Sequence, residues 1–555
     1  MTIETLPDNV LLEIFEFYLG KDDADEIDSG HDYDRWQTLV HVCYRWRCIV
    51  FASPRRLDLK LYCTRQRSVN LKTLDIWPAL PIVIYAPGIH FKEDVTNAIA
   101  ALKQPSRVCK ISYSHWQFQD PSQLLKEFAT IDKPFPALTN LELSTFQNVP
   151  VFPDSFLGGY APRLRSLHLD GIPYPSIGKL LSSTTNLVRL SLLYIPHSGY
   201  IAPEIIVPCL SMLPKLKLLE LGFRHPRSQT HRANRHPPPL TRVIFPNLTS
   251  IRFHGDIEYL EDILCQIETP ILNKTYFHFF NQLVFDTPLL GYFIGHTGAF
   301  TTIHKACVQF RGWTIQVILL GQEEMAAVIN NNRKVLDLKI CCEGLDWQVS
   351  AVAQVLNSFS SSLPALETLE VVVSREDWQG KIEVVQWREF LHSFTFVKTM
   401  TLESEDPVRL IAPALQEFAR ERATNVLPAL QNLFLRAYSS RASGPLKTAI
   451  EQFIAARQFC GQPVTVHYQD TKSEGSNEEV GDRAALCFPF DRYPMISTYR
   501  YIPLPLFFDT RGTNYYTFTP ITHSDLLVSY LWTLYAVHHD ATSLCLYPTA
   551  APVSC

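Results

Sequence analysis

Cysteine and histidine are the residues through which this chain could most readily do chemistry. It contains 13 cysteines and 18 histidines. No CxxC pair and no cysteine–histidine spacing typical of a zinc site occurs, and only Cys341 and Cys342 are adjacent. The histidines form no ligand-spaced cluster, and the neighbours His538 and His539 would point to opposite sides of a strand. We therefore expect reduced, buried thiols and neither a metal site nor a cofactor.

Two charged segments also need a chemical reading. Residues 22–34 are dense in carboxylates, but they lack the ligand order, the glycine and the final glutamate of an EF-hand loop. The segment Arg224–Pro239 concentrates arginine and histidine, but it has no interleaved aromatic residues for stacking on bases. We expect both segments to be solvated connectors.

Motif and charge together argue against several classes of function. The chain has no P-loop, dinucleotide-binding glycine motif, GxSxG elbow or HExxH pair, so we predict that it is not an enzyme. A net charge of −5 gives no general attraction for nucleic acid or membranes. The longest apolar run, Leu526–Val537, is short for a membrane span, and Glu4 and Asp8 are atypical of a signal peptide. We expect a cytoplasmic or nuclear location.

Two short amphipathic segments precede the main body. "LPDNVLLEIFEFYL" covers Leu6–Leu19 and "RWQTLVHVCYRWRCIV" covers Arg35–Val50. Pro7 suits the first turn of a helix, Gly20 suits a stop, and the second segment ends at Ser53-Pro54. Two such helices cannot bury both apolar faces alone, so they need the following domain, a partner, or both.

The body repeats one phrase, apolar-x-x-apolar-x-apolar, with roughly 23–33 residues between copies. Clear copies are "LTNLEL" (Leu138–Leu143), "LETLEV" (Leu366–Val371) and "LQNLFL" (Leu430–Leu435), and "QPVTV" (Gln462–Val466) is a terminal copy. Helical spacing separates them, as in Ile411, Leu415 and Phe418. Stacked units of one strand and one helix share a continuous core and a parallel sheet. A doubly wound α/β enzyme is the rival fold, but it rarely supplies so many strands with one phrase.

These patterns resemble known families. Leu-Pro, an apolar helix and then Val-Cys-x-x-Trp resemble an F-box, and the body resembles irregular leucine-rich repeats. The combination resembles the large F-box families of mushroom-forming fungi. The resemblance implies a three-helix unit that docks onto the Skp-type adaptor of an SCF ubiquitin ligase, next to its cullin. The repeats depart from the common pattern, because Phe146, Ile172, Ile195 and Tyr438 stand where Asn or Cys is usual.

Two sets of site residues follow. The F-box resemblance assigns the adaptor-binding or F-box core role to Leu6, Pro7, Val10, Leu11, Ile14, Phe15, Val42, Cys43 and Trp46. The residues that flank the middle apolar position of each phrase would face a target: Asn140, Glu142, Ser166, His168, Arg189, Ser191, Ser250, Arg252, Asp337, Lys339, Thr368, Glu370, Asn432 and Phe434. Their mixed charge favours a protein target and not nucleic acid.

The sequence thus predicts an α/β fold in three parts. These are an F-box-like helical domain at 1–53, a leucine-rich-repeat solenoid at 54–468 with short parallel strands and outer helices, and a poorly ordered tail at 469–555. The tail is either an appended interaction segment or a segment without a stable fold of its own. We expect the substrate receptor of an SCF-type ubiquitin ligase. The alternative is a leucine-rich-repeat scaffold whose N-terminal helices only cap the solenoid.

Overall fold

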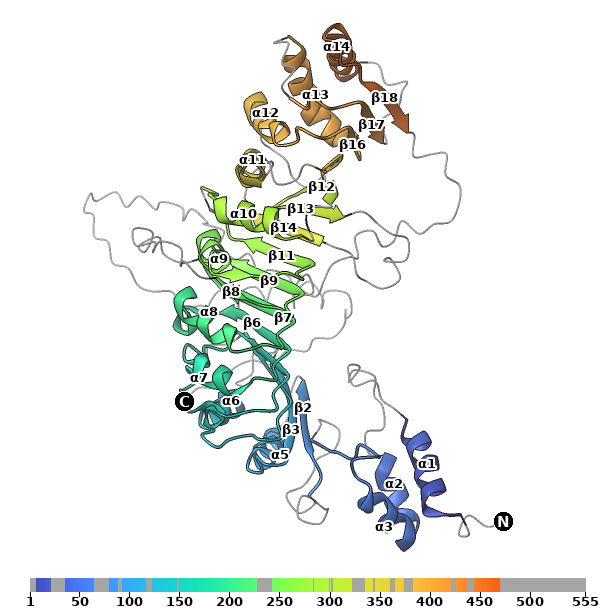
Figure 1. Cartoon of the computed structure of the whole chain (residues 1–555), viewed down its shortest axis with the longest axis vertical. Coiled ribbons are helices and arrows are strands. Elements are labelled where there is room, and N and C mark those ends of the chain that lie inside the picture. Colours follow the sequence, from blue (N-terminus) through green and yellow to red (C-terminus); the bar gives the residue numbers. More distant parts are fainter. Residues whose placement is uncertain are drawn as a thin grey trace, which may run out of the picture. The chain divides into compact units, whose positions relative to one another are not determined.

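One long sheet organises the chain in the computed structural model (Figure 1). The structure describes residues 6–20, 35–63, 79–87, 92–115, 122–146, 149–226, 242–282, 284–298, 300, 303–321, 335–342, 345–359, 365–373, 383–420, 426–436 and 444–469. The acidic connector at 22–34, most of the basic segment and the predicted tail after Gln469 lie outside these residues. The chain divides into two units, Met1–Gly475 and Ser476–Cys555, and all described residues belong to the first.

Three helices form the N-terminal part: α1 (Asp8–Leu19), α2 (Arg35–Val42) and α3 (Tyr44–Ala52). Gly20 ends α1 with a φ of 72°, as its position predicts. The single helix expected over Arg35–Val50 is wrong, because the chain breaks at Cys43. Cys43 is extended, and its Sγ accepts a hydrogen bond from the backbone N–H of Trp46, which caps α3.

Within the described residues, sixteen strands form the long sheet, in the spatial order β1-β2-β3-β4-β5-β6-β7-β9-β11-β14-β13-β12-β15-β16-β17-β18. Their bounds are β1 Leu61–Cys63, β2 Ile82–Pro87, β3 Val108–His115, β4 Asn140–Thr145, β5 Ser166–Asp170, β6 Arg189–Ile195, β7 Leu218–Phe223, β9 Ser250–Gly255, β11 Lys274–Phe279, β12 Ile303–Arg311, β13 Thr314–Gly321, β14 Val335–Cys341, β15 Thr368–Val373, β16 Thr399–Leu402, β17 Asn432–Arg436 and β18 Thr465–Gln469. A separate two-stranded sheet pairs β8 (Val243–Ile244) with β10 (Ile267–Glu268).

Helices connect the strands and pack against one another as a layer along the sheet (Figure 1). They are α5 Lys92–Leu102, α6 Ser122–Ala129, α7 Ile177–Ser183, α8 Pro203–Ser211, α9 Ile257–Leu264, α10 Pro288–His296, α11 Leu345–Phe359, α12 Val384–His392, α13 Glu405–Arg420 and α14 Pro445–Phe459, with short 3₁₀ turns η2 Phe156–Gly159 and η3 His197–Gly199. The strand-plus-helix unit repeats, which is the predicted α/β architecture of an irregular leucine-rich-repeat solenoid.

The repeated phrase places its apolar positions in the core. Leu141, Leu167, Leu190 and Leu219 lie opposite one another on β4 to β7, and all are buried. On the helix side, Ile411, Leu415 and Phe418 of α13 are also buried, as their spacing predicts. Side chains alternate across a strand, so the remaining positions point to the sheet face opposite the helices.

The expectation of an all-parallel sheet is wrong at one place. Strand β13 pairs antiparallel with both β12 and β14, whereas β12 runs parallel to β15 and β14 runs parallel to β11. A turn at Gly312–Trp313 joins β12 to β13, and an antiparallel pair needs only such a short connection. A hairpin without the leucine phrase therefore interrupts the array between two parallel stretches.

All described cysteines are free thiols. Burial raises the pKa of Cys63 to about 12 and that of Cys307 to about 11, so both stay protonated near neutral pH. The expected burial fails for Cys43, Cys48 and Cys460, which are exposed. In the part of the chain that the structure describes, no helix is both long and apolar enough to cross a bilayer.

A buried carboxylate ties neighbouring repeats together. Glu261 of α9 is fully buried, and its two carboxylate oxygens accept hydrogen bonds from the backbone N–H groups of Leu289 and Leu290 at 3.0 and 2.6 Å. These N–H groups begin α10, where no partner within the helix exists for them. One side chain thus caps the helix of the next repeat.

We predict that Glu261→Ala lowers the free energy of unfolding by about 2–4 kcal/mol, since it leaves one buried and one half-buried N–H donor without this partner. Urea unfolding of the purified chain measures the change. Glu268→Ala, at an exposed position of β10, is the matched control and should change stability little. Equal stability of the two variants would contradict this role for Glu261.

Candidate partner-binding surfaces

The three N-terminal helices share a small core. Leu11 and Phe15 of α1 are fully buried, and the Phe15 ring packs against Trp46 of α3 with 4.7 Å between centroids. Arg45 of α3 donates to the carbonyl oxygen of Leu6 at 2.6 Å and to the carboxylate of Asp8 at 2.6 Å. The start of α1 is therefore held directly on α3.

Further bonds tie these helices to the beginning of the sheet. Trp36 of α2 is buried, and its Nε1 donates to the carbonyl oxygen of Lys60 at 3.1 Å, one residue before β1. Glu16 of α1 pairs with Arg56 at 3.2 Å. The Trp36 ring also meets Phe51 edge-on, with centroids 6.1 Å apart. The helical part is thus anchored to the first repeat while keeping surface of its own.

That remaining surface is strongly apolar. Phe17 is 90% exposed, Tyr44 80% and Val42 55%, and Ile14 and Tyr18 are also exposed. Ile14, Phe17 and Tyr18 share one face of α1, because residues three and four apart are neighbours on a helix. We call these five residues the apolar N-terminal surface. Several large exposed apolar side chains on neighbouring helices are typical of interaction sites.

The predicted adaptor-binding set divides into three groups. Pro7, Ile14, Val42 and Cys43 are exposed, and Leu6, Val10 and Trp46 are half-buried. Leu11 and Phe15 are fully buried, so in this conformation they support the surface and do not contact an outside chain. Phe17, Tyr18 and Tyr44 are exposed as well, and the predicted set does not contain them. The apolar residues of α1 cover more of the helix surface than a single core-facing stripe requires. That excess was the sequence signal for exposed apolar residues on α1.

The predicted target-facing residues lie in register on one sheet face. Asn140, Ser166 and Arg189 pair across β4, β5 and β6, and the next row contains Glu142, His168 and Ser191. Farther along, Ser250 and Arg252 occupy the same rows on β9. On the C-terminal strands, Thr368 and Glu370 of β15 pair through β16 with Asn432 and Phe434 of β17. Asp337 lies in the second row on β14, and Lys339 lies one row farther along.

Most charges on this face are matched by a neighbouring strand. Arg252 pairs with Glu220 at 2.7 Å, and Lys305 pairs with Glu370 at 2.6 Å. The amide of Gln316 donates to both carboxylate oxygens of Asp337. Arg189, by contrast, is exposed. The face therefore carries mixed charge with local neutralisation, and Arg189 is a better probe of it than Arg252.

Two members of the predicted set are not surface groups. Ser191 is 4% exposed and Asp337 is 6% exposed, so neither can meet a partner directly in this conformation. For Ser191, larger neighbours on β5 and β7 occupy the same row. For Asp337, the added strand β13 brings Gln316 onto its carboxylate. The sequence predicted the strand positions of Ser191 and Asp337 but not their burial by neighbouring side chains.

A third row, which sequence reasoning missed apart from Lys339, contains two buried histidines. His254 of β9 and His278 of β11 stack with centroids 4.4 Å apart, and His278 Nε2 lies 3.0 Å from Cys341 Sγ. Burial, followed by the charge of Lys339, lowers the pKa of His254 to about 4. Burial also lowers the pKa of His278 well below its usual value. Both imidazoles are therefore neutral near pH 7.

Backbone strain accompanies this third row. The pairing of β6 with β7 shifts register after Leu192, and Tyr194 has a φ of 46°, which is rare for a residue with a side chain. Its ring meets His254 edge-on, 6.3 Å between centroids. Nearby Asp170 is buried, which raises the pKa of its carboxyl. Strained residues of this kind concentrate at functional sites, so the centre of the face joins the candidate surface.

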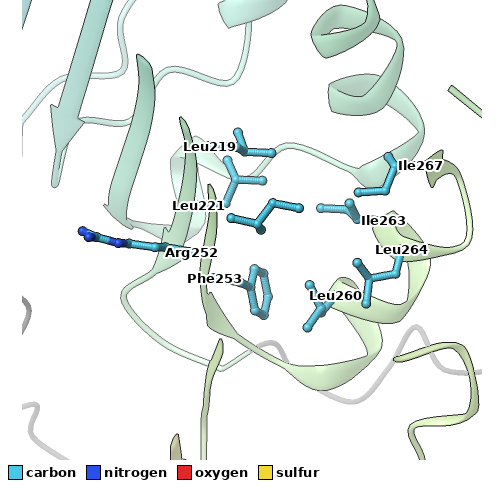
Figure 2. A pocket seen from close by; sticks show the side chains of 9 residues that line it. Leu219, Leu221, Arg252, Phe253, Leu260, Ile263, Leu264 and Ile267 are labelled. Carbon is cyan, nitrogen blue, oxygen red and sulfur yellow. The ribbon is translucent and has the colours of Figure 1, made fainter. Parts of the chain in front are cut away.

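A small apolar cavity lies between the sheet and α9. Figure 2 shows Leu219, Leu221 and Phe253 meeting Leu260, Ile263 and Leu264 of α9, whereas Arg252 points to the opposite side of its strand. The cavity measures about 10 Å³, which is close to the room that one water needs. Its lining offers no polar group besides Arg252, so it is a packing gap between sheet and helix.

Comparison with known proteins does not assign the chain to a family. No protein-family model and no curated protein matches the chain. Among solved structures, the leucine-rich repeat-containing protein LegL7 from Legionella pneumophila is similar at 13% identity, with a TM-score of 0.25 and coverage of 62% of this chain and 97% of that chain. The assignment of a repeat solenoid rests on the sheet and helix layers described above.

We predict that the stacked histidines make folding pH-dependent. The unfolded chain binds a proton on His254 near pH 6.5 and the folded chain only near 4, so this contribution is fully present above about pH 6.5 and is lost as pH falls toward 4. The loss amounts to about 3 kcal/mol. Urea unfolding between pH 7 and pH 4 should show that the free energy of unfolding depends less steeply on pH for His254→Gln than for the wild-type chain. His392→Gln, at an exposed position, is the control. The same pH dependence of the free energy of unfolding in the wild-type chain and both variants would contradict the prediction.

Proposed function

We propose that the chain is the substrate-recognition subunit of an SCF-type E3 ubiquitin ligase. Its α1–α3 unit acts as an F-box that binds a Skp-type adaptor, and through it the cullin complex. The repeat sheet holds a protein target. The observation that carries the proposal is the apolar N-terminal surface, which stays exposed although α1–α3 already have a packed core and an anchor on the first repeat.

Such a receptor needs no bond chemistry of its own. It raises the effective concentration of a target lysine near the charged E2 enzyme that the ligase complex recruits. Two features of the chain support this division of labour. Apolar exposed aromatics, the usual anchors of protein interfaces, lie on the helices. Mixed, locally neutralised charges lie on the sheet, where a protein target with both signs of charge can be accommodated.

A second candidate has its own supporting observation. The bond from Trp36 to Lys60 and the pair between Glu16 and Arg56 are what a cap on the first repeat requires. In this reading the chain is a protein-binding scaffold outside ubiquitin transfer. A pure cap, however, gains nothing from a phenylalanine that is 90% exposed at Phe17. The ligase receptor therefore accounts for more of the α1–α3 surface.

We predict that the double variant Phe17→Ala and Tyr44→Ala abolishes capture of a purified Skp-type adaptor, because each anchor contributes about 2 kcal/mol, or roughly thirtyfold in Kd. Isothermal titration calorimetry with the full chain measures the affinity. Adaptor affinity should also fall in the variants Leu6→Ala, Pro7→Ala and Ile14→Ala.

Phe459→Ala is the matched control, because Phe459 is 79% exposed but lies at the end of α14. It should leave adaptor affinity unchanged. If the wild-type chain fails to bind any adaptor while Phe17→Ala and Tyr44→Ala leave stability unaltered, the scaffold reading replaces the ligase reading.

We predict that Arg189→Glu removes specific proteins from those that co-purify with the chain, since Arg189 is an exposed cation in the first row. Arg163→Glu reverses an exposed charge in the turn before β5 and is the control. Quantitative mass spectrometry of the purified complexes compares the three proteins. Identical sets of co-purifying proteins would exclude this part of the sheet as the recognition face.

A further inference from the structure

Two tryptophans are exposed where the hairpin interrupts the repeats. Trp313 occupies the turn between β12 and β13 and is 59% exposed, and Trp347 in the first turn of α11 is 49% exposed. Val385 at the start of α12 is exposed as well. An indole ring has a large apolar area, which is unfavourable in water, and tryptophan is among the most frequent anchors of binding sites. Trp313 and Trp347 follow the carboxyl ends of β12 and β14, which run in the same direction because both pair antiparallel with β13, so these two segments lie at one edge of the sheet. The start of α12 joins them, because Gln386 bonds to the backbone of Asp346.

A fully buried glutamine fixes the geometry of this edge. Gln348 donates through Nε2 to the carbonyl oxygens of Arg311 at 2.9 Å, Gly312 at 3.1 Å and Cys342 at 3.2 Å. The N–H of Cys342 in turn donates to the carbonyl oxygen of Trp313 at 3.0 Å. The hairpin turn, the end of β14 and the start of α11 therefore form one frame. A surface held in this way loses little conformational entropy when it binds.

A second glutamine links two residues with carboxylate side chains at the same edge. Gln386 donates to the backbone oxygen of Asp346 at 3.4 Å and accepts from the backbone N–H of Glu383 at 3.2 Å. Asp346 lies in the first turn of α11, and Glu383 is the exposed N-cap of α12. Arg311, one of the described residues at this edge, is a cation, and it donates to Gln309 Oε1 at 2.8 Å.

We propose that this edge binds a cationic segment of a protein partner, rich in arginine or lysine. We name it the aromatic rim and define it as Trp313, Trp347, Val385, Asp346 and Glu383. Indole faces attract cations, guanidinium above all, and the two carboxylates supply the opposite charge. An acidic segment would meet repulsion from the same carboxylates. The inference rests on the proposed role of the repeats in holding a protein target, and not on adaptor docking.

The test uses the full chain and short labelled peptides in fluorescence anisotropy. A peptide of alternating arginine and glycine should bind, and the same peptide with glutamate in place of arginine should not. Trp313→Ala and Trp347→Ala should each weaken binding about fivefold. The double variant Asp346→Asn and Glu383→Gln should weaken it as well and should reduce its dependence on salt.

Matched controls separate the rim from general charge. Phe396→Ala removes an exposed aromatic ring outside the rim, and Glu268→Gln removes an exposed carboxylate of β10, and both should leave binding unchanged. The carboxylate variant keeps both indoles, so it tests the rim even if a tryptophan variant fails to fold. Equal binding of both peptides, or unchanged affinity in the rim variants, would overturn the inference. Adaptor affinity of the same variants, measured in parallel, reports separately on the ligase role.

Discussion

The rest of the structure depends on the in-register pairing of short strands. Each strand sends its apolar positions to the helix side and its remaining positions to the other face, and pairing with both neighbours joins these positions into rows. No single repeat buries enough apolar surface to stand alone, so the core is shared along the array. The same constraint fixes the binding face, because register alone decides which side chains from different repeats become neighbours.

Side-chain hydrogen bonds to the backbone of neighbouring elements keep this array aligned. Glu261 fastens the start of one helix to the preceding one, and Trp36 fastens the N-terminal helices to the first strand. The hairpin β12–β13 is accommodated because β13 presents Gln316 to Asp337 and β12 presents Lys305 to Glu370, which continues the pattern of cross-strand pairs. Rigid frames of this kind suit a molecule whose proposed work is to hold two proteins near each other.

The sequence predicted what periodicity can encode. Repeated phrases located most of the parallel strands, and helical spacing located the buried face of α13, because burial follows directly from these periods. It did not predict the break at Cys43, which depends on one side chain capping a backbone N–H, or the hairpin, which lacks the phrase. The burial of Ser191 and Asp337 and the exposure of Phe17 and Tyr44 depend on neighbours distant in sequence. Single-residue roles therefore required the three-dimensional arrangement.

Amide hydrogen exchange of the full chain, with and without a Skp-type adaptor, tests the central claim most directly. The account predicts that the adaptor slows exchange within 6–20 and 35–52 and leaves the strands β4 to β9 unchanged, since docking on α1–α3 is separate from the recognition face. Protection confined to the sheet, or no change anywhere at saturating adaptor, would contradict the assignment of α1–α3 as the docking unit.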